Sequence, residues 1–179
     1  GDKEAKQGME VLMGVKEHLE SFQSVRTLTL SPEEKKHVYD LFLLSGKPVL
    51  YVCNVDDDSA AEGNAYAETF RSSVLAEGAE VLTLAARLES EIAELEEADD
   101  RRAFLQDAGL TEPGVDRLIR SAYRLLDLQT FFTAGPKEVR AWTIRRGMTA
   151  PQAAGVIHSD LERGFIRSEV IRYEDFVRL

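Results

Sequence analysis

Amide and carboxylate side chains directly follow the most strand-like run of the chain. Pro48–Cys53 is apolar and rich in β-favouring residues, and it leads into Asn54–Asp57, NVDD. When an asparagine is followed three residues later by a carboxylate, the asparagine can brace the loop and contact a purine base. The carboxylate can then accept hydrogen bonds from the edge of that base. Asparagine and aspartate at strand ends also form ordinary turns, because their side chains bond the nearby backbone. The spacing by itself therefore leaves two readings open, a base-binding loop and a plain turn.

The elements around this loop are those of a parallel α/β sheet. A short apolar run with turn signals at both ends, such as Pro48–Cys53, predicts a strand buried on both faces. Ala65–Ala76 has the pattern of a helix and Glu80–Ala85 is a second β-rich run, which together predict a strand–helix–strand unit. Further helices are predicted over Asp99–Ala108 and Val115–Leu126. Polar groups just past the carboxyl end of such a strand lie where open α/β sheets bind ligands.

Two helices are predicted ahead of this unit. Apolar residues recur at every third or fourth position over Asp2–Phe22, which indicates an amphipathic helix. Such a helix is usually one arm of a helical hairpin, so we expect another arm to precede it in a longer chain. Ser31 and Pro32 provide the N-cap and the first turn of a second helix, which Gly46 is expected to end.

The residues from 128 onwards predict a separate small unit. Gln129–Thr133 and Val139–Ile144 predict a β-hairpin, a short helix is expected over Thr149–Val156, and Phe165–Ile171 has the pattern of another strand. A hairpin, a helix and a strand in this order are typical of a β-grasp, ubiquitin-like fold. Such a sheet normally needs one or two more strands, so we expect this unit to be truncated.

The amino-acid composition limits the kinds of molecule that the chain as a whole can attract. The 179 residues carry a net charge of -10 with a pI near 4.9, so the chain has no global attraction to nucleic acid or to an anionic membrane. Residues 1–129 hold 14 Lys and Arg against 26 Asp and Glu, whereas residues 130–179 hold 8 against 6. The single Cys53 excludes an internal disulfide and fits a reduced cytoplasmic protein. No apolar run is long enough to span a bilayer, and no His, Cys and carboxylate cluster has metal-ligand spacing.

The mildly basic C-terminal part contains a candidate surface for RNA. Strand alternation places Arg140 and Trp142 on one face, and a guanidinium beside an aromatic ring suits contact with RNA. The opposing reading is that arginines exposed on a sheet are ordinary and that the basic excess is small. The candidate residues for RNA or ribosome contact are Lys137, Arg140, Trp142, Arg145 and Arg146.

The sequence resembles the YchF/Obg-like ATPase family of translation-factor-class P-loop proteins. The run TFFTAGPKEVRAWTIRRGMTAPQAAGVIHSDLERGFIRSEVI (Thr130–Ile171) is similar to the TGS domain of that family nearly throughout. Upstream, KPVLYVCNV, GAEVLTLAARLESEIAEL and GVDRLIRSAYRLLDL occur in the family's order. The resemblance implies part of a P-loop NTPase-type parallel sheet with a helical (coiled-coil) arm, followed by a TGS domain of the β-grasp type. The implied limits are 1–45 for half of the arm and its return linker, 46–127 for the C-terminal part of the G domain, and 128–179 for the TGS domain.

The same resemblance assigns a purine-base site. Asn54 would contact the purine, Val55 would offer a small apolar surface, and Asp57 would accept protons from the base edge. Ala86 would support the base through its backbone N–H. Members of the family typically prefer ATP over GTP and usually have Asn-x-x-Glu here, whereas the shorter Asp57 is the carboxylate that guanine-reading loops use. The resemblance therefore implies ATP as the nucleotide, with GTP as the alternative.

The residues that handle phosphates are expected elsewhere. No GxxxxGK[ST] run occurs in the 179 residues, so we expect the chain alone to be catalytically inactive and Mg²⁺ to bind only with a preceding half. The resemblance implies a cytoplasmic protein with the ribosome or its RNA as partner, and neither membrane nor DNA is expected. The alternative hypothesis is a non-enzymatic module that binds RNA or the ribosome through the TGS domain.

Overall fold

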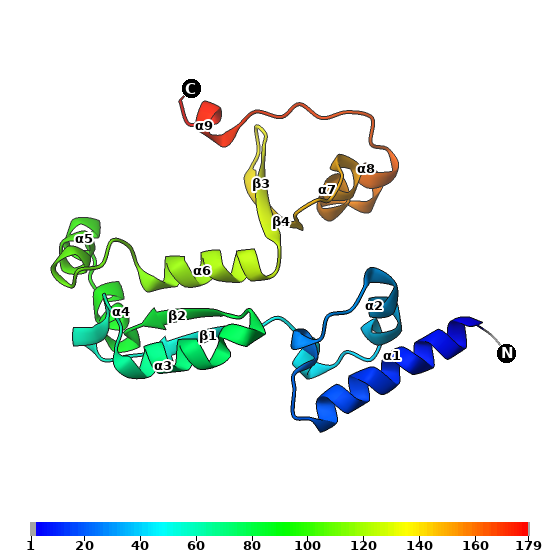
Figure 1. Cartoon of the computed structure of the whole chain (residues 1–179). Coiled ribbons are helices and arrows are strands. Elements are labelled where there is room, and N and C mark those ends of the chain that lie inside the picture. Colours follow the sequence, from blue (N-terminus) through cyan, green and yellow to red (C-terminus); the bar gives the residue numbers. More distant parts are fainter. Residues whose placement is uncertain (1–2, 179) are drawn as a thin grey trace. The chain divides into compact units, whose positions relative to one another are not determined.

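The computed structural model describes residues 3–178 as a mixed α/β protein, shown in Figure 1. The chain divides into two compact units, Gly1–Leu125 and Leu126–Leu179, and each is considered by itself. The predicted helix start at Asp2 and the predicted domain ends at residues 1 and 179 lie outside the described residues. No helix in the part that the structure describes is long and apolar enough to cross a membrane.

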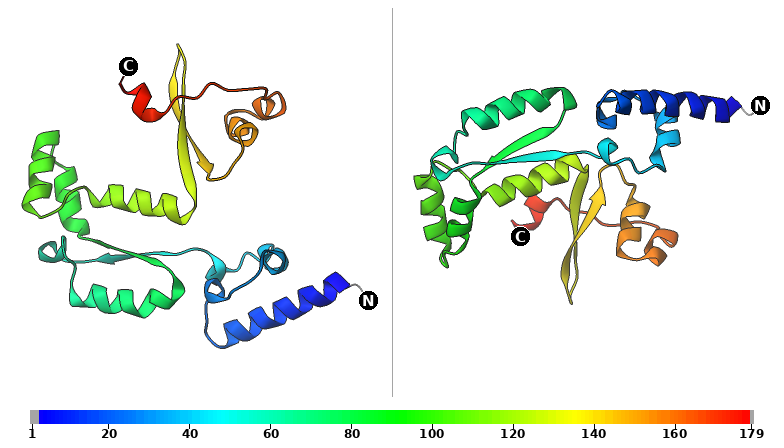
Figure 2. Two further views of the ribbon diagram at one scale, coloured as in Figure 1. Left: turned by 45° about the horizontal axis from the view of Figure 1, so that its top comes forward. Right: turned by 90° about the horizontal axis from the view of Figure 1, so that it is seen from below.

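The first unit contains the predicted strand–helix–strand arrangement. Strands β1 (Leu50–Asn54) and β2 (Glu80–Leu84) pair in parallel, with Leu50 opposite Glu80 and Asn54 opposite Leu84. Helix α3 (Ala65–Val74) connects them. Figures 1 and 2 show α3 and α6 (Gly114–Leu125) on opposite sides of this two-stranded sheet. The parallel pairing brings the carboxyl ends of both strands to one edge.

The prediction that the first strand is buried on both faces is wrong. Every residue of β1 is half-buried or exposed, and Val52 keeps 46% of its surface accessible. Among the described residues only β2 is hydrogen-bonded to β1, and the two helices cover the sheet only in part. The apolar side chains of β1 therefore meet fewer neighbours than those of a central strand in a larger sheet.

Local signals set the helix ends well, with one exception. Helix α1 spans Lys3–Glu20, and α2 spans Pro32–Tyr39 with a capping box between Ser31 and Glu34. The prediction that α2 continues to Gly46 is wrong. The backbone at Phe42 has a φ of 48°, and this left-handed conformation cannot continue a right-handed helix.

The packed core of the first unit lies under the carboxyl edge of the sheet. Helices α4 (Ala86–Ala93) and α5 (Ala98–Asp107) pack together beside α6. The core is a cluster of buried apolar side chains from these helices and the adjoining loops, namely Ala60, Ala85, Leu88, Ile92, Leu105 and Leu110.

The second unit contains the predicted hairpin and helix. Strands β3 (Leu128–Ala134) and β4 (Val139–Arg145) pair antiparallel, and α7 (Ala150–Ile157), α8 (Ser159–Arg163) and α9 (Tyr173–Phe176) follow. Thr149 caps α7 with a capping box, as its sequence indicates.

The predicted strand Phe165–Ile171 is absent. This segment is irregular, and Ile166 and Val170 are largely exposed. A strand forms only when its backbone groups pair with a neighbouring strand, and the sheet of the second unit holds only β3 and β4 within the described residues. The hairpin and α7 agree with a β-grasp unit, but the β-grasp assignment itself stays a prediction.

Candidate functional site

Asn54 joins the two loops at the carboxyl edge of the sheet. It is the last residue of β1, its side chain is exposed, and its Oδ1 accepts a hydrogen bond from the backbone N–H of Ala86 at 3.0 Å. One residue further on, the N–H of Val55 donates to the carbonyl of Leu84 at 2.8 Å. These bonds hold the loop after β1 against the loop after β2, 32 residues away in the sequence.

Asp57 lies in the same pair of loops. It begins the short 3-10 helix Asp57–Ser59, which the Asp56 side chain caps by accepting from the N–H of Ser59 at 3.0 Å. The Asp57 carboxylate forms an ion pair with the guanidinium of Arg87, on the first turn of α4. The hydrogen bond from Arg87 to Asp57 is the main reason why the pKa of Arg87 is raised.

The two loops are supported from below by the hydrophobic core. Ala60 follows the 3-10 helix and Ala85 precedes α4, and both side chains are buried in the core cluster. Val55 is half-buried and packs against the same cluster. The polar groups of Asn54 and Asp57 are thus displayed from a surface whose backbone is fixed by buried packing.

The fold brings together all four residues predicted for a base site, namely Asn54, Val55, Asp57 and Ala86. The backbone N–H groups of Val55 and Ala86, however, already donate to partners within the two loops. The N–H of Ala86, which the resemblance assigns to the base, bonds to Asn54, and the N–H of Val55 bonds to Leu84. Sequence reasoning missed Arg87 as the partner of Asp57. Opposite charges 30 residues apart can be paired in many ways, so no spacing rule could have identified this contact.

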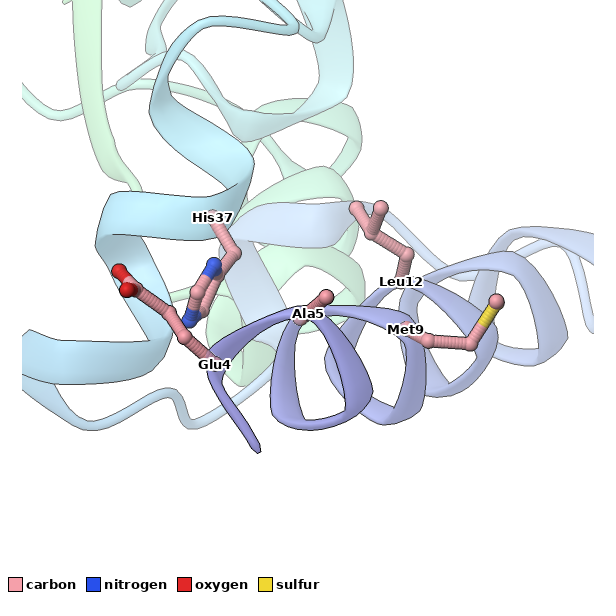
Figure 3. Close-up of a pocket in the computed structure, with 6 residues that line it drawn as sticks. Glu4, Ala5, Met9, Leu12 and His37 are labelled. Atoms are coloured by element: carbon pink, nitrogen blue, oxygen red, sulfur yellow. The ribbon is translucent and has the colours of Figure 1, made fainter. Parts of the chain in front are cut away.

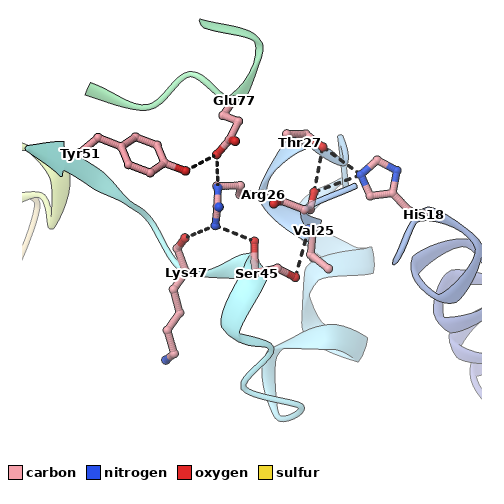
Figure 4. A network of polar contacts seen from close by, with 9 residues as sticks. His18, Val25, Arg26, Thr27, Ser45, Lys47, Tyr51 and Glu77 are labelled. Atoms are coloured by element: carbon pink, nitrogen blue, oxygen red, sulfur yellow. Dashed lines mark hydrogen bonds and ion pairs between the residues drawn. The ribbon is translucent and has the colours of Figure 1, made fainter. Parts of the chain in front are cut away.

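A separate network ties the segment after α1 to the sheet, as Figure 4 shows. Arg26 Nε donates to Glu77 Oε2 at 2.8 Å, and its Nη1 donates to the carbonyls of Ser45 and Lys47 at 3.1 and 3.4 Å. The hydroxyl of Tyr51 donates to the same Glu77 oxygen at 3.1 Å. The hydrogen bond from Arg26 is the main cause of the lowered pKa of Glu77, so this carboxylate stays ionised to a lower pH than an ordinary glutamate does.

A groove of about 400 Å³ between α1 and α2 is distinct from the carboxyl-edge loops. Its wall is largely apolar, with Met9 and Leu12 at one end and His37 and Glu4 at the other, as Figure 3 shows. None of the predicted site residues lines it. Within residues 3–178, no group of three or more His, Cys, Asp or Glu side chains is arranged to hold a metal ion.

In the second unit, Arg140 and Trp142 form the expected pair. The guanidinium carbon of Arg140 lies 4.2 Å from the centroid of the Trp142 ring, and Trp142 Nε1 donates to Thr133 Oγ1 at 2.9 Å. Because side chains alternate along a strand, Arg145 lies on the opposite face of β4. Arg146 lies just past the strand and pairs with Asp127 at 3.4 Å.

Lys137 is exposed in the hairpin turn. The five basic and aromatic candidates therefore do not form one continuous face. Arg140 and Trp142 are the two that share a face and are in contact with each other.

Fold and loops together define a class of protein. The chain has a parallel strand–helix–strand unit whose polar loops meet at the carboxyl ends of the strands, and open α/β sheets bind their ligands at this edge. A separate hairpin unit follows it in the chain. The chain is thus a mixed α/β protein with polar loops at one edge of a parallel sheet and an additional C-terminal unit.

Comparison with known proteins identifies the family. The family profile YchF-GTPase_C, described as a protein of unknown function, matches residues 128–179. The ribosome-binding ATPase YchF of Bacillus subtilis is 47% identical over 178 residues, which are 98% of this chain and 48% of that protein. The protein of the same name from Escherichia coli O157:H7 is 49% identical over 177 residues, 99% of this chain and 48% of its own length.

A solved structure agrees with these relatives. The structure of the Schizosaccharomyces pombe YchF GTPase matches with a TM-score of 0.85 and 29% identity, over 97% of this chain and 46% of that one. The chain belongs to the YchF family. It spans about half the length of the curated relatives it matches.

Proposed function

We propose that this chain carries the base-recognition loops of a YchF-type nucleotide hydrolase that works on the ribosome in the cytoplasm. Residues 46–127 would form the C-terminal part of the nucleotide-binding domain. Residues 1–45 would supply half of the helical arm with its return linker, and residues 128–179 the TGS domain. The names of the relatives, ribosome-binding ATPase and YchF GTPase, support this class of activity and partner.

The hydrogen bond between Asn54 and Ala86 is the observation that carries the proposal. It holds the loops after both strands together at the edge where ligands of α/β sheets bind. Because Asn54 Oδ1 accepts from Ala86, the amide NH₂ of Asn54 is left as the donor that would bond to a ring nitrogen of a purine. The carboxylate of Asp57, held in the adjoining loop, would accept from the base edge.

The nucleotide is ATP or GTP, and its phosphates would be held by residues other than these. The polar groups at the carboxyl edge are the amide of Asn54, the carboxylate of Asp57 with the guanidinium of Arg87 paired to it, and backbone groups. This set fits a base, and it lacks the cradle of N–H groups and the lysine of a phosphate-binding loop. Mg²⁺ would be bound where the phosphates are. We therefore assign base recognition to this chain and assign hydrolysis only to the complete protein.

Calorimetry on the full-length gene product that contains this chain tests the proposal. Asn54→Ala should weaken binding of both ATP and GTP by about tenfold, the order expected when hydrogen bonds to a ligand are lost. Asp57→Glu should shift the preference towards ATP. Asn64→Ser is a matched control, because Asn64 caps α3 by accepting from the N–H of Ala67 and serine preserves such a cap. Unchanged affinities in Asn54→Ala would refute the base site.

The stacked Arg140 and Trp142 side chains favour a second candidate function, contact with ribosomal RNA. A guanidinium that lies over an aromatic ring offers both a positive charge and a flat surface on which a base can stack. This activity requires no nucleotide, so it would also serve a purely non-enzymatic ribosome-binding module.

Charge reversal separates this surface from the other basic candidates. Arg140→Glu should reduce co-sedimentation with ribosomes, and the reduction should be larger at low salt. Arg145→Glu, on the other face of β4, is the matched control from the same strand. Equal effects of the two substitutions would show that the face carrying Arg140 has no special role, and unchanged pelleting in both would remove β4 from the contact.

A further inference from the structure

The Asp57 carboxylate forms an ion pair with Arg87, which affects how well its oxygens can accept hydrogen bonds from a base. The guanidinium of Arg87 bonds to Asp57 Oδ2, and the Arg87 side chain is 76% exposed whereas that of Asp57 is 26% exposed. The nearby carboxylates of Asp58 and Glu91 also favour the charged form of Arg87 and hold positive charge at this place. Arg87 is thus the more exposed member of the pair, and in the proposed site a base that bonds to Asp57 would share this carboxylate with the guanidinium.

Guanine and adenine make different demands on a carboxylate. The edge of guanine presents two parallel donors, the ring N1–H and the exocyclic N2–H₂, which fit the two oxygens of one carboxylate. Adenine presents one donor group, the exocyclic N6–H₂, beside an acceptor. A carboxylate oxygen that already accepts from a guanidinium has one lone pair and part of its negative charge engaged, so it is a weaker acceptor for a second donor. Such a carboxylate can still accept from adenine through its other oxygen, whereas the second of its two bonds to guanine is weakened.

We propose that Arg87 is a specificity-determining residue that lowers the preference for guanine by engaging one oxygen of Asp57. This inference rests on the proposed base site. It explains how a loop with the short Asp57, the carboxylate typical of guanine-reading loops, can belong to a family whose relatives are named ATPases.

A purely structural role for the ion pair leads to a different expectation. If Arg87 only ties the start of α4 to the loop after β1, its removal should loosen both loops. The affinity for all purine nucleotides should then fall by the same factor. If Arg87 acts on specificity, the ratio of the two affinities should change. The ratio therefore distinguishes the two roles, even if the substitution also lowers the affinity for both nucleotides.

The test is calorimetry of the full-length gene product with ADP and GDP, which avoids hydrolysis during the titration. Arg87→Ala should shift the ratio of the dissociation constants about fivefold towards GDP, the order expected for one exposed ion pair. Arg87→Lys, which keeps the charge but has a single ammonium group, should shift it less. Arg102→Ala is the matched control, because Arg102 forms a similar exposed ion pair with Asp99 on α5.

A double-substitution cycle completes the test. In an Asp57→Ala background, Arg87→Ala should leave the ratio unchanged, because the oxygen that Arg87 engages is gone. Suppose that Asn54→Ala weakens nucleotide binding as expected but that the single Arg87→Ala variant leaves the ratio of the two dissociation constants unchanged. This result would refute the role of Arg87 in specificity and would still support the base site. If neither Asn54→Ala nor Asp57→Ala affects either nucleotide, the base site and this inference both fail.

Discussion

The two candidate surfaces of this chain are built in different ways. At the carboxyl edge of the parallel sheet, the important contacts join residues about 30 positions apart, Asn54 with Ala86 and Asp57 with Arg87. On the hairpin, Arg140 and Trp142 are two residues apart on one strand. The first surface lies on a packed core cluster, whereas Ile144 is the only buried residue among those described in the second unit.

The difference indicates how each surface responds to change. A site assembled from distant segments depends on the core that holds those segments, so core substitutions far from the polar groups should damage it. A surface made by strand alternation depends only on its own hairpin. The following predictions test this contrast, in order of decreasing effect.

The largest effect is expected from Ile92→Ala, which empties part of the core under the carboxyl-edge loops. Ile92 is buried in the core cluster, so its truncation should lower the free energy of unfolding of the first unit by about 2–5 kcal/mol. Chemical denaturation followed by circular dichroism measures this loss. The adjacent, exposed Glu91→Ala is the control.

The contrast becomes sharper if unfolding is also followed by fluorescence. Trp142 is the only tryptophan of the chain and lies in the second unit, so its fluorescence reports on that unit alone. We expect the fluorescence midpoint to be the same in Ile92→Ala as in the unchanged chain. A parallel shift of both signals would show that the two units unfold together, and the proposed independence of the hairpin surface would be lost.

The next largest loss of stability is expected from Gly114→Ala at the start of α6. The N–H of Gly114 donates to Glu89 Oε1 at 2.7 Å, and a Cβ at this position would overlap that oxygen and Leu84 Cδ2. Relief of the overlap requires the side chains of Leu84 and Glu89 to move, and Glu89 then loses its hydrogen bond to the N–H of Gly114. We expect this to cost about 1–3 kcal/mol in unfolding free energy. Gly14→Ala is the control, because nothing lies within 4 Å of its added Cβ on α1. That substitution should instead stabilise by about 0.5–1 kcal/mol.

Glu77→Gln should change the pH dependence of stability in the first unit. The folded-state pKa of Glu77 is lowered, chiefly by the hydrogen bond from Arg26, so its contribution is present above the ordinary pKa of a glutamate and is lost as the pH falls through the folded value. The pair is only partly exposed, with 17% of the Arg26 and 25% of the Glu77 side chain accessible. The unchanged chain should therefore lose more stability on acidification than the variant does.

Thermal unfolding at several pH values measures this difference. Glu68→Gln is the control, because Glu68 forms an ion pair with Arg71 on the surface of α3 and its side chain is 67% exposed. Equal slopes for the unchanged chain and Glu77→Gln would mean that the pair between Arg26 and Glu77 does not hold in solution.

The smallest effect is expected from Arg140→Ala on the hairpin. Loss of an exposed cation–π contact should cost about 0.5–1 kcal/mol and should change the emission of Trp142, because the guanidinium lies over its ring. Arg145→Ala, on the opposite face of β4, should leave the emission unchanged. Identical spectra for the two variants would contradict the stacking and would weaken the case for this surface as an RNA contact.

Most elements could be predicted from the sequence because their signals are local. The strand at Leu50–Asn54, the left-handed Gly78 after α3 and the capping box at Thr149 follow from apolar runs, glycine freedom and capping chemistry. The strand expected over Phe165–Ile171 had the same kind of local signal and did not form. A strand also requires a partner, and no local pattern provides one.

Two features follow directly from spacing along one short segment. A loop with an asparagine and a carboxylate follows the first strand, and Arg140 and Trp142 share a face of β4. The hydrogen bond between Ala86 and Asn54 and the ion pair between Arg87 and Asp57, by contrast, arise only when the chain is folded. These pairs depend on the parallel register of β1 with β2 and on the direction in which α4 leaves the sheet. That direction is set by how Leu88 and Ile92 pack into the core, which involves residues distant in the sequence.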